Sequence, residues 1–521
     1  MNKIIKTIIL PGLILILIAN LVSAQKKNVL FIAVDDLKPI LGCYGNTLIQ
    51  TPNIDKLASQ GIIFTNNHCQ QAVCAPSRAS LLTGMRPDVT KVWDLKTWIR
   101  DKNPDILTMP QYFIQNGYFC TGVGKIYDRR SVDTKHDSIS WSEPFAFEGD
   151  TNYYDPHYGI PALAYYQLPE TKKEVERLTP IAISKGLKRF AIKADVMETI
   201  KPSTECADVP DNAYVDGVLA LSAIERLERI SKQNQPFFLA VGFKRPHLPF
   251  VAPKKYWDLY QRDEMPLAKN QKASINSPLI AYHNSGEIRS YTDIPPLSSF
   301  SDLKNDLLSE EKQKELIHGY YAAVSYIDAM IGKVINTLDS LGLRENTVIV
   351  LWGDHGWHLG DHGLWCKHTN FEQATRAPLI FSMPDIKVKS SAAPVEFVDI
   401  FPTLCEITGI DIPDYLEGKS LLPIMKGTKT KIKEYAVSQF PREETMGYAF
   451  RDERYRYVVW LKDNYRSNMS FNKDLIVAEE LYDYKTDPLE TVNYINSKNY
   501  RDVVKKMKNY SFDFFASKHR N

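Results

Sequence analysis

Two short, continuous apolar runs constrain the fold more than any other feature of the sequence. The first run is Asn28–Val34, and the second is Thr347–Trp352. A run of this length without polar alternation is too short for a helix and is typical of a parallel strand that is buried on both faces. We therefore predict an α/β fold, in which helices flank a large sheet that is mixed or mostly parallel.

Each of these two predicted strands ends in residues that can bind a cation. Asp35-Asp36 follows the first run, and Asp354-His355 follows the second. In open α/β sheets the ligand crevice lies at the carboxyl ends of the strands, and Ca²⁺ prefers oxygen ligands. One acidic pair alone is equally well explained as a capping or solvated pair. Two such strand ends, far apart in sequence, favour a shared cation.

The segment around Cys74 carries a more specific signal. It reads Val73-Cys74-Ala75-Pro76-Ser77-Arg78, and a short apolar stretch leads from there to Gly84. We predict a helix that Ser77 caps and Gly84 ends. Cys74 would then lie near a helix N-terminus, where backbone amides favour an anion, and Arg78 can bind the same anion. For a cysteine alone, a buried structural thiol is the simpler interpretation.

The Cys-x-Pro-Ser-Arg segment resembles the signature of the type I, formylglycine-dependent sulfatases, and other segments resemble the iduronate-2-sulfatase-like branch of that family. These segments are Gly124-Lys125, Trp357–Lys367 and Phe371–Phe381. The resemblance implies an alkaline-phosphatase-like fold with a smaller C-terminal subdomain, which consists of a four-stranded antiparallel sheet and a helix. It also implies one calcium ion and a maturation enzyme that converts Cys74 to formylglycine (3-oxoalanine).

The resemblance also implies roles for individual residues. The implied calcium ligands are Asp35, Asp36, Cys74, Asp354 and His355. The catalytic residues would be Cys74, Arg78, Lys125, His247 and Lys367, and the substrate-binding residues Asp128, Arg129, Lys244, Trp357 and His358. In the implied mechanism a hydroxyl of the hydrated aldehyde attacks sulfur, cationic side chains neutralise the sulfate oxygens, and His247 protonates the leaving oxygen. A histidine with no such context is more often structural.

One position departs from the pattern of this family. Its members carry a histidine three residues after the lysine that corresponds to Lys125, and this chain has Asp128 there. That histidine takes a proton when sulfate leaves. Asp128 can replace it if burial raises the pKa of the carboxyl group, whereas Arg129 and Arg130 would lower that pKa and make Asp128 an anchor for the arginines or a ligand of a sugar hydroxyl. In a further alternative, the arginines and His136 reshape the pocket.

The expected substrate is a sulfated polysaccharide or its oligosaccharides. The resemblance favours a 2-O-sulfate on a uronic acid or xylose, in an algal ulvan-type glycan or a glycosaminoglycan. A phosphate or phosphonate ester hydrolase of the alkaline phosphatase superfamily is one alternative, because it shares the metal-bearing strand ends. An inactive glycan-binding homologue is another, although it would have no need of Cys74 and Arg78.

The N-terminus predicts export. Lys3 and Lys6 precede an apolar run over Ile8–Val22, and small residues follow at Ser23-Ala24. The run is shorter than the roughly 20 residues of a membrane-spanning helix, so we predict a signal peptide at residues 1–24, a periplasmic or secreted protein and no stable membrane anchor. The formal net charge of +2 gives no field that favours nucleic acid. Seven cysteines without Cys-x-x-Cys spacing argue against a zinc site and allow one or two disulfides.

We predict a catalytic domain over residues 25–430 and a C-terminal subdomain over residues 431–521, because Lys426–Lys433 is typical of an exposed linker. Within the catalytic domain, residues 133–206 are expected to form loops and short helices over the mouth of the site. Residues 270–306 are expected to be a surface loop, and Ser309–Leu341 the longest helix.

Overall fold

The computed structural model of the 521-residue chain describes residues 26–296, 308–462 and 471–517. The predicted signal peptide at residues 1–24 lies outside the described residues. Among the helices of the described ranges, none has both the length and the apolar character that a membrane crossing requires.

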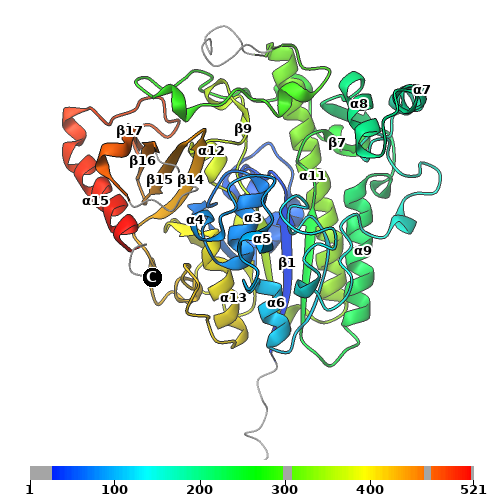
Figure 1. Cartoon of the computed structure of the whole chain (residues 1–521). Coiled ribbons are helices and arrows are strands. Elements are labelled where there is room, and N and C mark those ends of the chain that lie inside the picture. The colour runs from blue at the N-terminus through cyan, green and yellow to red at the C-terminus, as the bar shows by residue number, and fades with distance from the viewer. Residues whose placement is uncertain (1–25, 297–307, 463–470, 518–521) are drawn as a thin grey trace, which may run out of the picture.

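A mixed sheet, seven-stranded within the described residues, forms the centre of the molecule (Figure 1). Its strand order is β12-β2-β11-β8-β1-β6-β4. Strand β1 pairs in parallel with β6 and β8, and β6 pairs in parallel with β4, whereas β11 is antiparallel to β8 and β2. The strands are β1 Asn28–Val34, β2 Gly61–Phe64, β4 Phe119–Gly124, β6 Phe237–Phe243, β8 Thr347–Gly353, β11 Leu379–Ser382 and β12 Ser390–Ser391. The carboxyl ends of β8, β1, β6 and β4 therefore share one edge.

The apolar runs of the sequence become strands because both faces of this sheet are covered. Along β1, Leu30, Ile32 and Val34 pack into one core, and the alternate residues pack into a second core on the opposite face. Helices α2 Pro52–Ser59, α9 Val215–Ile230 and α11 Glu310–Ser340 cover the first face. Helices α3 Cys74–Thr83, α6 Met109–Gln115 and α13 Ile400–Thr408 cover the second. This arrangement confirms the predicted α/β architecture.

The C-terminal part of the chain forms a separate antiparallel sheet with its own apolar cluster. Its strands are β14 Ala436–Arg442, β15 Thr445–Arg451, β16 Tyr455–Lys462 and β17 Ile476–Asp483. Helix α15, Arg501–Ser517, packs on this four-stranded sheet through Met507, Phe514 and Phe515. The predicted C-terminal sheet and helix are thus confirmed.

Smaller elements connect these layers. Strand β5 (Thr204–Ala207) pairs with β7 (Phe250–Pro253), β9 (His358–Leu359) with β10 (Trp365–Cys366), and β3 (Asn67–His68) with β13 (Val395–Glu396). The short helices are α4 Pro87–Thr90, α5 Ile99–Lys102, α10 Lys254–Trp257, α12 Glu372–Thr375 and α14 Leu422–Met425.

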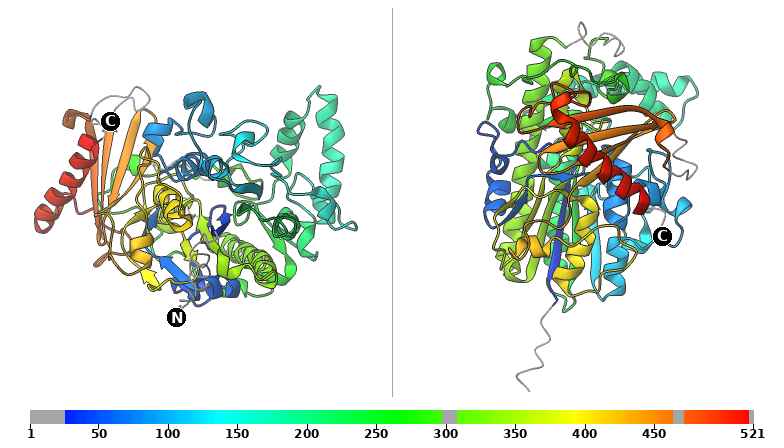
Figure 2. Two further views of the ribbon diagram at one scale, coloured as in Figure 1. Left: turned by 90° about the horizontal axis from the view of Figure 1, so that it is seen from below. Right: turned by 90° about the vertical axis from the view of Figure 1, so that its left-hand side faces the viewer.

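Two expectations need correction. Residues 133–206 contain more regular structure than short helices, because α7 (Pro169–Ser184) and α8 (Phe190–Thr199) form a hairpin. This hairpin lies at the opposite side of the molecule from α15, as Figures 1 and 2 show. All seven cysteines are free thiols, so the structure contains neither of the disulfides that the sequence allowed.

Candidate active site

The predicted site residues meet at the edge of the sheet where the parallel strands end. Asp35 and Asp36 follow β1, and Asp354 and His355 follow β8, which is the strand next to it. Asp36 has a left-handed backbone with φ of 59°. Its backbone N–H donates to Asp354 Oδ1 at 2.9 Å, and its carbonyl accepts a hydrogen bond from Tyr320 of α11 at 2.7 Å. The long helix therefore fixes the loop that carries the two aspartates.

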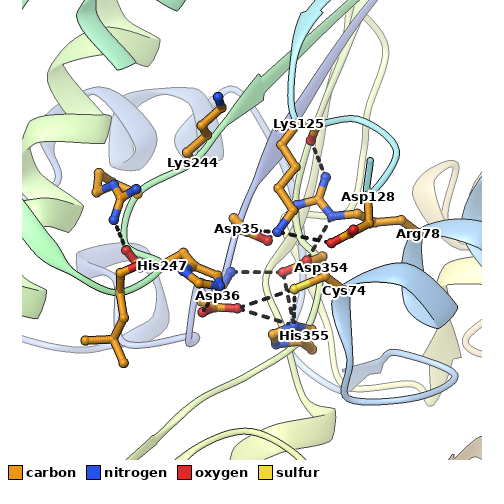
Figure 3. Close-up of polar contacts among 12 residues, drawn as sticks. Asp35, Asp36, Cys74, Arg78, Lys125, Asp128, Lys244, His247, Asp354 and His355 are labelled. Atoms are coloured by element: carbon orange, nitrogen blue, oxygen red, sulfur yellow. Dashed lines mark hydrogen bonds and ion pairs between the residues drawn. The ribbon is translucent and has the colours of Figure 1, made fainter. Parts of the chain in front are cut away.

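Cys74 is the first residue of α3, and its side chain points into this group (Figure 3). The residue that caps the helix is Val73 rather than Ser77, so the prediction about Ser77 was wrong. Pro76 lacks only an N–H that the first turn leaves unbonded, so the helix can begin before it. The hydroxyl of Ser77 donates instead to the carbonyl of Asp354, and Gly84 ends the helix as predicted.

Four side chains form a compact group of metal-ligand type. One ligand atom from each of Asp36, Cys74, Asp354 and His355 lies within 4.8 Å of every other. His355 Nε2 lies 3.4 Å from Cys74 Sγ and 3.3 Å from Asp36 Oδ1. Cys74 is only 1% exposed, and burial together with Asp35 raises the pKa of its thiol well above the ordinary value. The unmodified thiol is therefore a poor nucleophile in this site.

Arg78 joins the two strand ends to the helix. Its side chain is fully buried, and its guanidinium donates to Asp354 Oδ2 at 2.9 Å and to Asp35 Oδ1 at 3.1 Å. It also donates to the carbonyl groups of Lys125 and Ile126, which follow β4. One guanidinium thus fixes three strand ends, which uses the fork geometry that lysine lacks.

Lys125 is the second cation of the site. Its Nζ donates to Asp35 Oδ2 at 2.6 Å and lies 3.5 Å from Asp128 Oδ2. Burial opposes ionisation of Asp35, but Lys125 and Arg78 outweigh burial and hold the pKa of that carboxyl group well below its ordinary value. Asp35 is therefore a carboxylate at neutral pH, as a cation ligand must be.

Lys367 is the third cation of the site. One of its partners, Glu287, is a site residue that the sequence analysis missed. Lys367 Nζ lies 3.1 Å from both carboxylate oxygens of Asp36 and 3.0 Å from Glu287 Oε1. Glu287 Oε1 is also 3.2 Å from His247 Nε2. Burial opposes the charge of Glu287, yet Lys367 and His247 hold its pKa well below the ordinary value. Residues 270–296 are therefore not merely a surface loop, because they carry a carboxylate into the site.

A cavity of about 340 Å³ opens above this group. Its lining includes Cys74, His247, Glu287, Lys367 and His368. His247 is held by a hydrogen bond between Nδ1 and the carbonyl of Leu248 at 2.6 Å. Arg130, Tyr165, Lys201 and Tyr291 line the same cavity.

Asp128 is buried and bound to basic groups. These contacts bear on whether Asp128 accepts a proton or anchors an arginine, which the sequence left open. Arg130 donates to both of its carboxylate oxygens, at 2.8 Å each. Burial would raise the pKa of Asp128, but Arg130 and Lys125 lower it far below its ordinary value. An acid of this strength is a poor proton acceptor, so the geometry argues against Asp128 as a base and matches the alternative in which it anchors an arginine.

Four other residues predicted to bind substrate do not line the cavity. The guanidinium of the exposed Arg129 lies over the rings of Phe147 and Phe190, at 5.9 and 5.7 Å from the centroids. Lys244 pairs with Glu148 and lies apart from the cysteine in Figure 3. Trp357 and His358 are fully buried; the Trp357 ring lies under Lys367, with Nζ at 4.8 Å, and His358 Nε2 bonds Thr369 Oγ1 at 2.9 Å. Their predicted roles in binding stay predictions.

Two family models match the chain. The model described as "Sulfatase" matches residues 27–410, and the one described as "N-sulphoglucosamine sulphohydrolase, C-terminal" matches residues 360–513. Iduronate 2-sulfatase from Homo sapiens is 32% identical over 550 residues, which cover 92% of this chain and 93% of the human protein. A sulfatase from Formosa agariphila is 32% identical over 505 residues, which cover 93% of this chain and 86% of that protein.

Solved structures show the same fold. A 2-O GAG sulfatase aligns with a TM-score of 0.65 and 22% identity over 95% of this chain and 93% of its own. The phosphonate monoester hydrolase of Agrobacterium radiobacter aligns with a TM-score of 0.67 and 22% identity over 94% and 96%. The fold is thus alkaline-phosphatase-like, as predicted. Since a family model spans most of the sequence and full-length relatives match at 32% identity, this chain belongs to the sulfatase family and is a sulfuric ester hydrolase.

Proposed function

We propose that this protein hydrolyses O-sulfate esters of a sulfated glycan outside the cytoplasm, with residue 74 as the nucleophile. The observation that carries the proposal is the ring of three buried cations around Cys74, formed by Arg78, Lys125 and Lys367. A sulfate ester develops negative charge on its oxygens during the reaction, and fixed cations in a buried site stabilise that charge. The predicted signal peptide supports export.

The donor set suits a hard cation. Asp35, Asp36 and Asp354 offer carboxylate oxygens and His355 offers an imidazole nitrogen, and the side chains are buried in one group with Cys74. We infer that these residues hold one Ca²⁺, because oxygen ligands predominate. When bound, the cation would draw electrons from the sulfate group and from the oxygen that residue 74 presents after modification.

Cys74 is the proposed site of conversion to formylglycine. In its hydrated form that residue would supply a hydroxyl nucleophile where the sulfur atom now lies. Its position at the start of α3 supports this role, because the free N–H groups of a helix N-terminus would favour the anionic sulfate there. Peptide mass analysis of the exported protein tests the conversion, and full activity of protein that retains the thiol would contradict it.

His247 is the proposed general acid for the leaving oxygen. Both of its ring nitrogens face acceptors, since Nδ1 contacts the Leu248 carbonyl and Nε2 contacts Glu287 Oε1. An imidazolium satisfies both acceptors and carries a proton at Nε2, on the side of the cavity. The Glu287 carboxylate would hold that ring in place, and Lys367 and Lys125 would bind the sulfate oxygens.

The finer substrate proposal is a 2-O-sulfated uronic acid or xylose within an ulvan-type glycan or a glycosaminoglycan. It is supported by the relatives, one of which is named iduronate 2-sulfatase. The test is a panel of defined sulfated oligosaccharides, with phosphate and phosphonate esters of the same alcohols as comparators. Release of sulfate in preference to phosphate supports the proposal. Faster hydrolysis of the phosphonate esters would favour the alternative, whose fold is shared by the phosphonate monoester hydrolase.

A further inference from the structure

The lining of the cavity contains a lysine that the proposed sulfate-ester chemistry does not use. Lys201 follows α8, and it faces the segment that contains Ser290 and Tyr291. Its backbone N–H donates to Thr292 Oγ1 at 3.0 Å, so the two segments are tied together. Lys201 therefore lines the cavity at a point where two segments of the chain are hydrogen-bonded to each other.

The ammonium group of Lys201 makes one hydrogen bond and one contact with an aromatic ring. Its Nζ donates to Ser290 Oγ at 2.6 Å and lies 4.1 Å from the centre of the Tyr291 ring. Within the described ranges, no carboxylate forms an ion pair with it. An ammonium group has three donors, and the structure accounts for one of them. Burial lowers the pKa of Lys201 more than Glu287 raises it, so an additional anion would stabilise the charge of this ammonium group.

This lysine differs from the two lysines that contact Asp35 and Asp36. Lys125 and Lys367 are each paired with aspartate, so their charge is largely balanced before substrate binds. The charged group that influences Lys201 is Glu287, whose carboxylate already contacts Lys367 and His247. Lys193 lies over the ring of Tyr165, another residue of the cavity lining, at 5.0 Å and has no ion-pair partner among the residues that the structure describes.

We propose that Lys201 binds a second anionic group of the substrate, beside the sulfate ester that is hydrolysed. The inference rests on the proposed function and narrows its substrate class to glycans that carry two neighbouring anions. Tyr165 and Tyr291 line the same cavity, and their rings would offer apolar surface to the sugar. The second anion is a carboxylate of a uronic acid or a second sulfate, since an ammonium binds either as a point charge.

The test compares substrates that differ in one charge. The three probes are a 2-O-sulfated uronic acid glycoside, its methyl ester, and a disulfated hexose glycoside. We expect wild-type protein to prefer a dianionic probe over the methyl ester by about 10- to 100-fold in kcat/KM, which corresponds to one charged hydrogen bond. Lys201→Met keeps the contact with Tyr291 and should abolish most of this preference, mainly through KM. The faster of the two dianionic probes, the sulfated uronic acid glycoside or the disulfated hexose glycoside, identifies the second anion as a carboxylate or a sulfate.

Lys185→Met is the matched control, because Lys185 is on the same hairpin, is exposed and pairs with Asp195 at 2.8 Å. It removes the same charge and should retain the wild-type preference. Equal kcat/KM for all three probes, or an unaltered preference in Lys201→Met, would overturn the proposal. If none of the probes releases sulfate, the proposed function fails instead. In that case, calorimetry can measure the binding of the unsulfated uronic acid glycoside to the wild-type protein and to both variants. If Lys201 binds the carboxylate, the affinity for this glycoside should fall in Lys201→Met and not in Lys185→Met.

Discussion

Glu287→Gln tests whether the carboxylate of the 270–296 segment organises the site. The change keeps the shape of the side chain and removes its charge. Lys367 Nζ would lose a charged partner at 3.0 Å but keep Asp36 at 3.1 Å, whereas His247 Nε2, 3.2 Å away, would be left with a neutral amide in place of the carboxylate. We therefore expect Lys367 to stay in place and His247 to become mobile.

The expected loss of stability in Glu287→Gln follows from these contacts. A pair of unit charges about 3 Å apart interacts by roughly 5 kcal/mol at an effective dielectric constant of about 20, before desolvation is counted. Glutamine avoids the desolvation cost of the carboxylate and can accept one hydrogen bond. Glu287 is also 20% exposed. We expect the free energy of unfolding to fall by about 1–3 kcal/mol. This is less than the roughly 3–5 kcal/mol for a buried charge that loses its partner, because Lys367 keeps Asp36.

Two measurements test this prediction. Sulfate release from a 2-O-sulfated disaccharide should show kcat/KM lowered by about 10- to 100-fold, with most of the loss in kcat. Urea unfolding should show the loss of stability in full above pH 4.5, the ordinary pKa of the group, and a shrinking loss as the pH falls toward the lower folded-state pKa. Asp258→Asn, which removes an exposed carboxylate that pairs with Lys254, is the control. Wild-type kinetics in Glu287→Gln would refute the reasoning.

Three further predictions concern the metal group, the arginine anchor and a buried histidine. Asp354→Ala should lower turnover by several orders of magnitude and abolish the stabilisation by added Ca²⁺ that thermal unfolding of the wild type should show; equal Ca²⁺ stabilisation in both proteins would reject this ligand. Asp128→Asn should raise KM and largely retain kcat, because Arg130 loses its anchor, and accumulation of sulfated enzyme would instead identify Asp128 as a base. Burial lowers the pKa of His68 to about 3 from 6.5. Between these two pH values the unfolded chain binds the proton and the folded chain does not, so the wild-type protein loses about 1.4 kcal/mol of stability for each pH unit below 6.5 through His68. His68→Gln should remove this contribution. Urea unfolding that shows the same dependence of stability on pH in both proteins would contradict the prediction.

The central strands of the fold and much of the candidate site could be predicted from the sequence. Strands β1 and β8 were predictable because both faces of the sheet are buried, which requires an unbroken apolar run. The clustering of Asp35 with Asp354 followed from the shared edge of the parallel strands. These inferences needed only short segments and one rule of sheet geometry.

Other features depend on contacts between distant segments. Glu287 lies in a polar, serine-rich stretch without periodicity, and only the folded loop brings it to Lys367 and His247. The cap at Val73 was missed because Ser77 has a better partner in the carbonyl of Asp354, far away in sequence. Helix α7 contains Pro180, which ordinarily argues against a helix interior.

The burial of Cys74 has a consequence for the proposed modification of this residue. Cys74 is 1% exposed, and Ser77 and Arg78, which belong to the segment that a maturation enzyme would read, are 0% exposed. Arg78 also holds three strand ends together, so the segment cannot be released without opening the sheet edge. The proposed conversion of Cys74 to formylglycine would therefore require a maturation enzyme that acts on the nascent or unfolded chain. A polypeptide that folds before this conversion would lack the proposed nucleophile, and unfolding would be needed to expose the segment again.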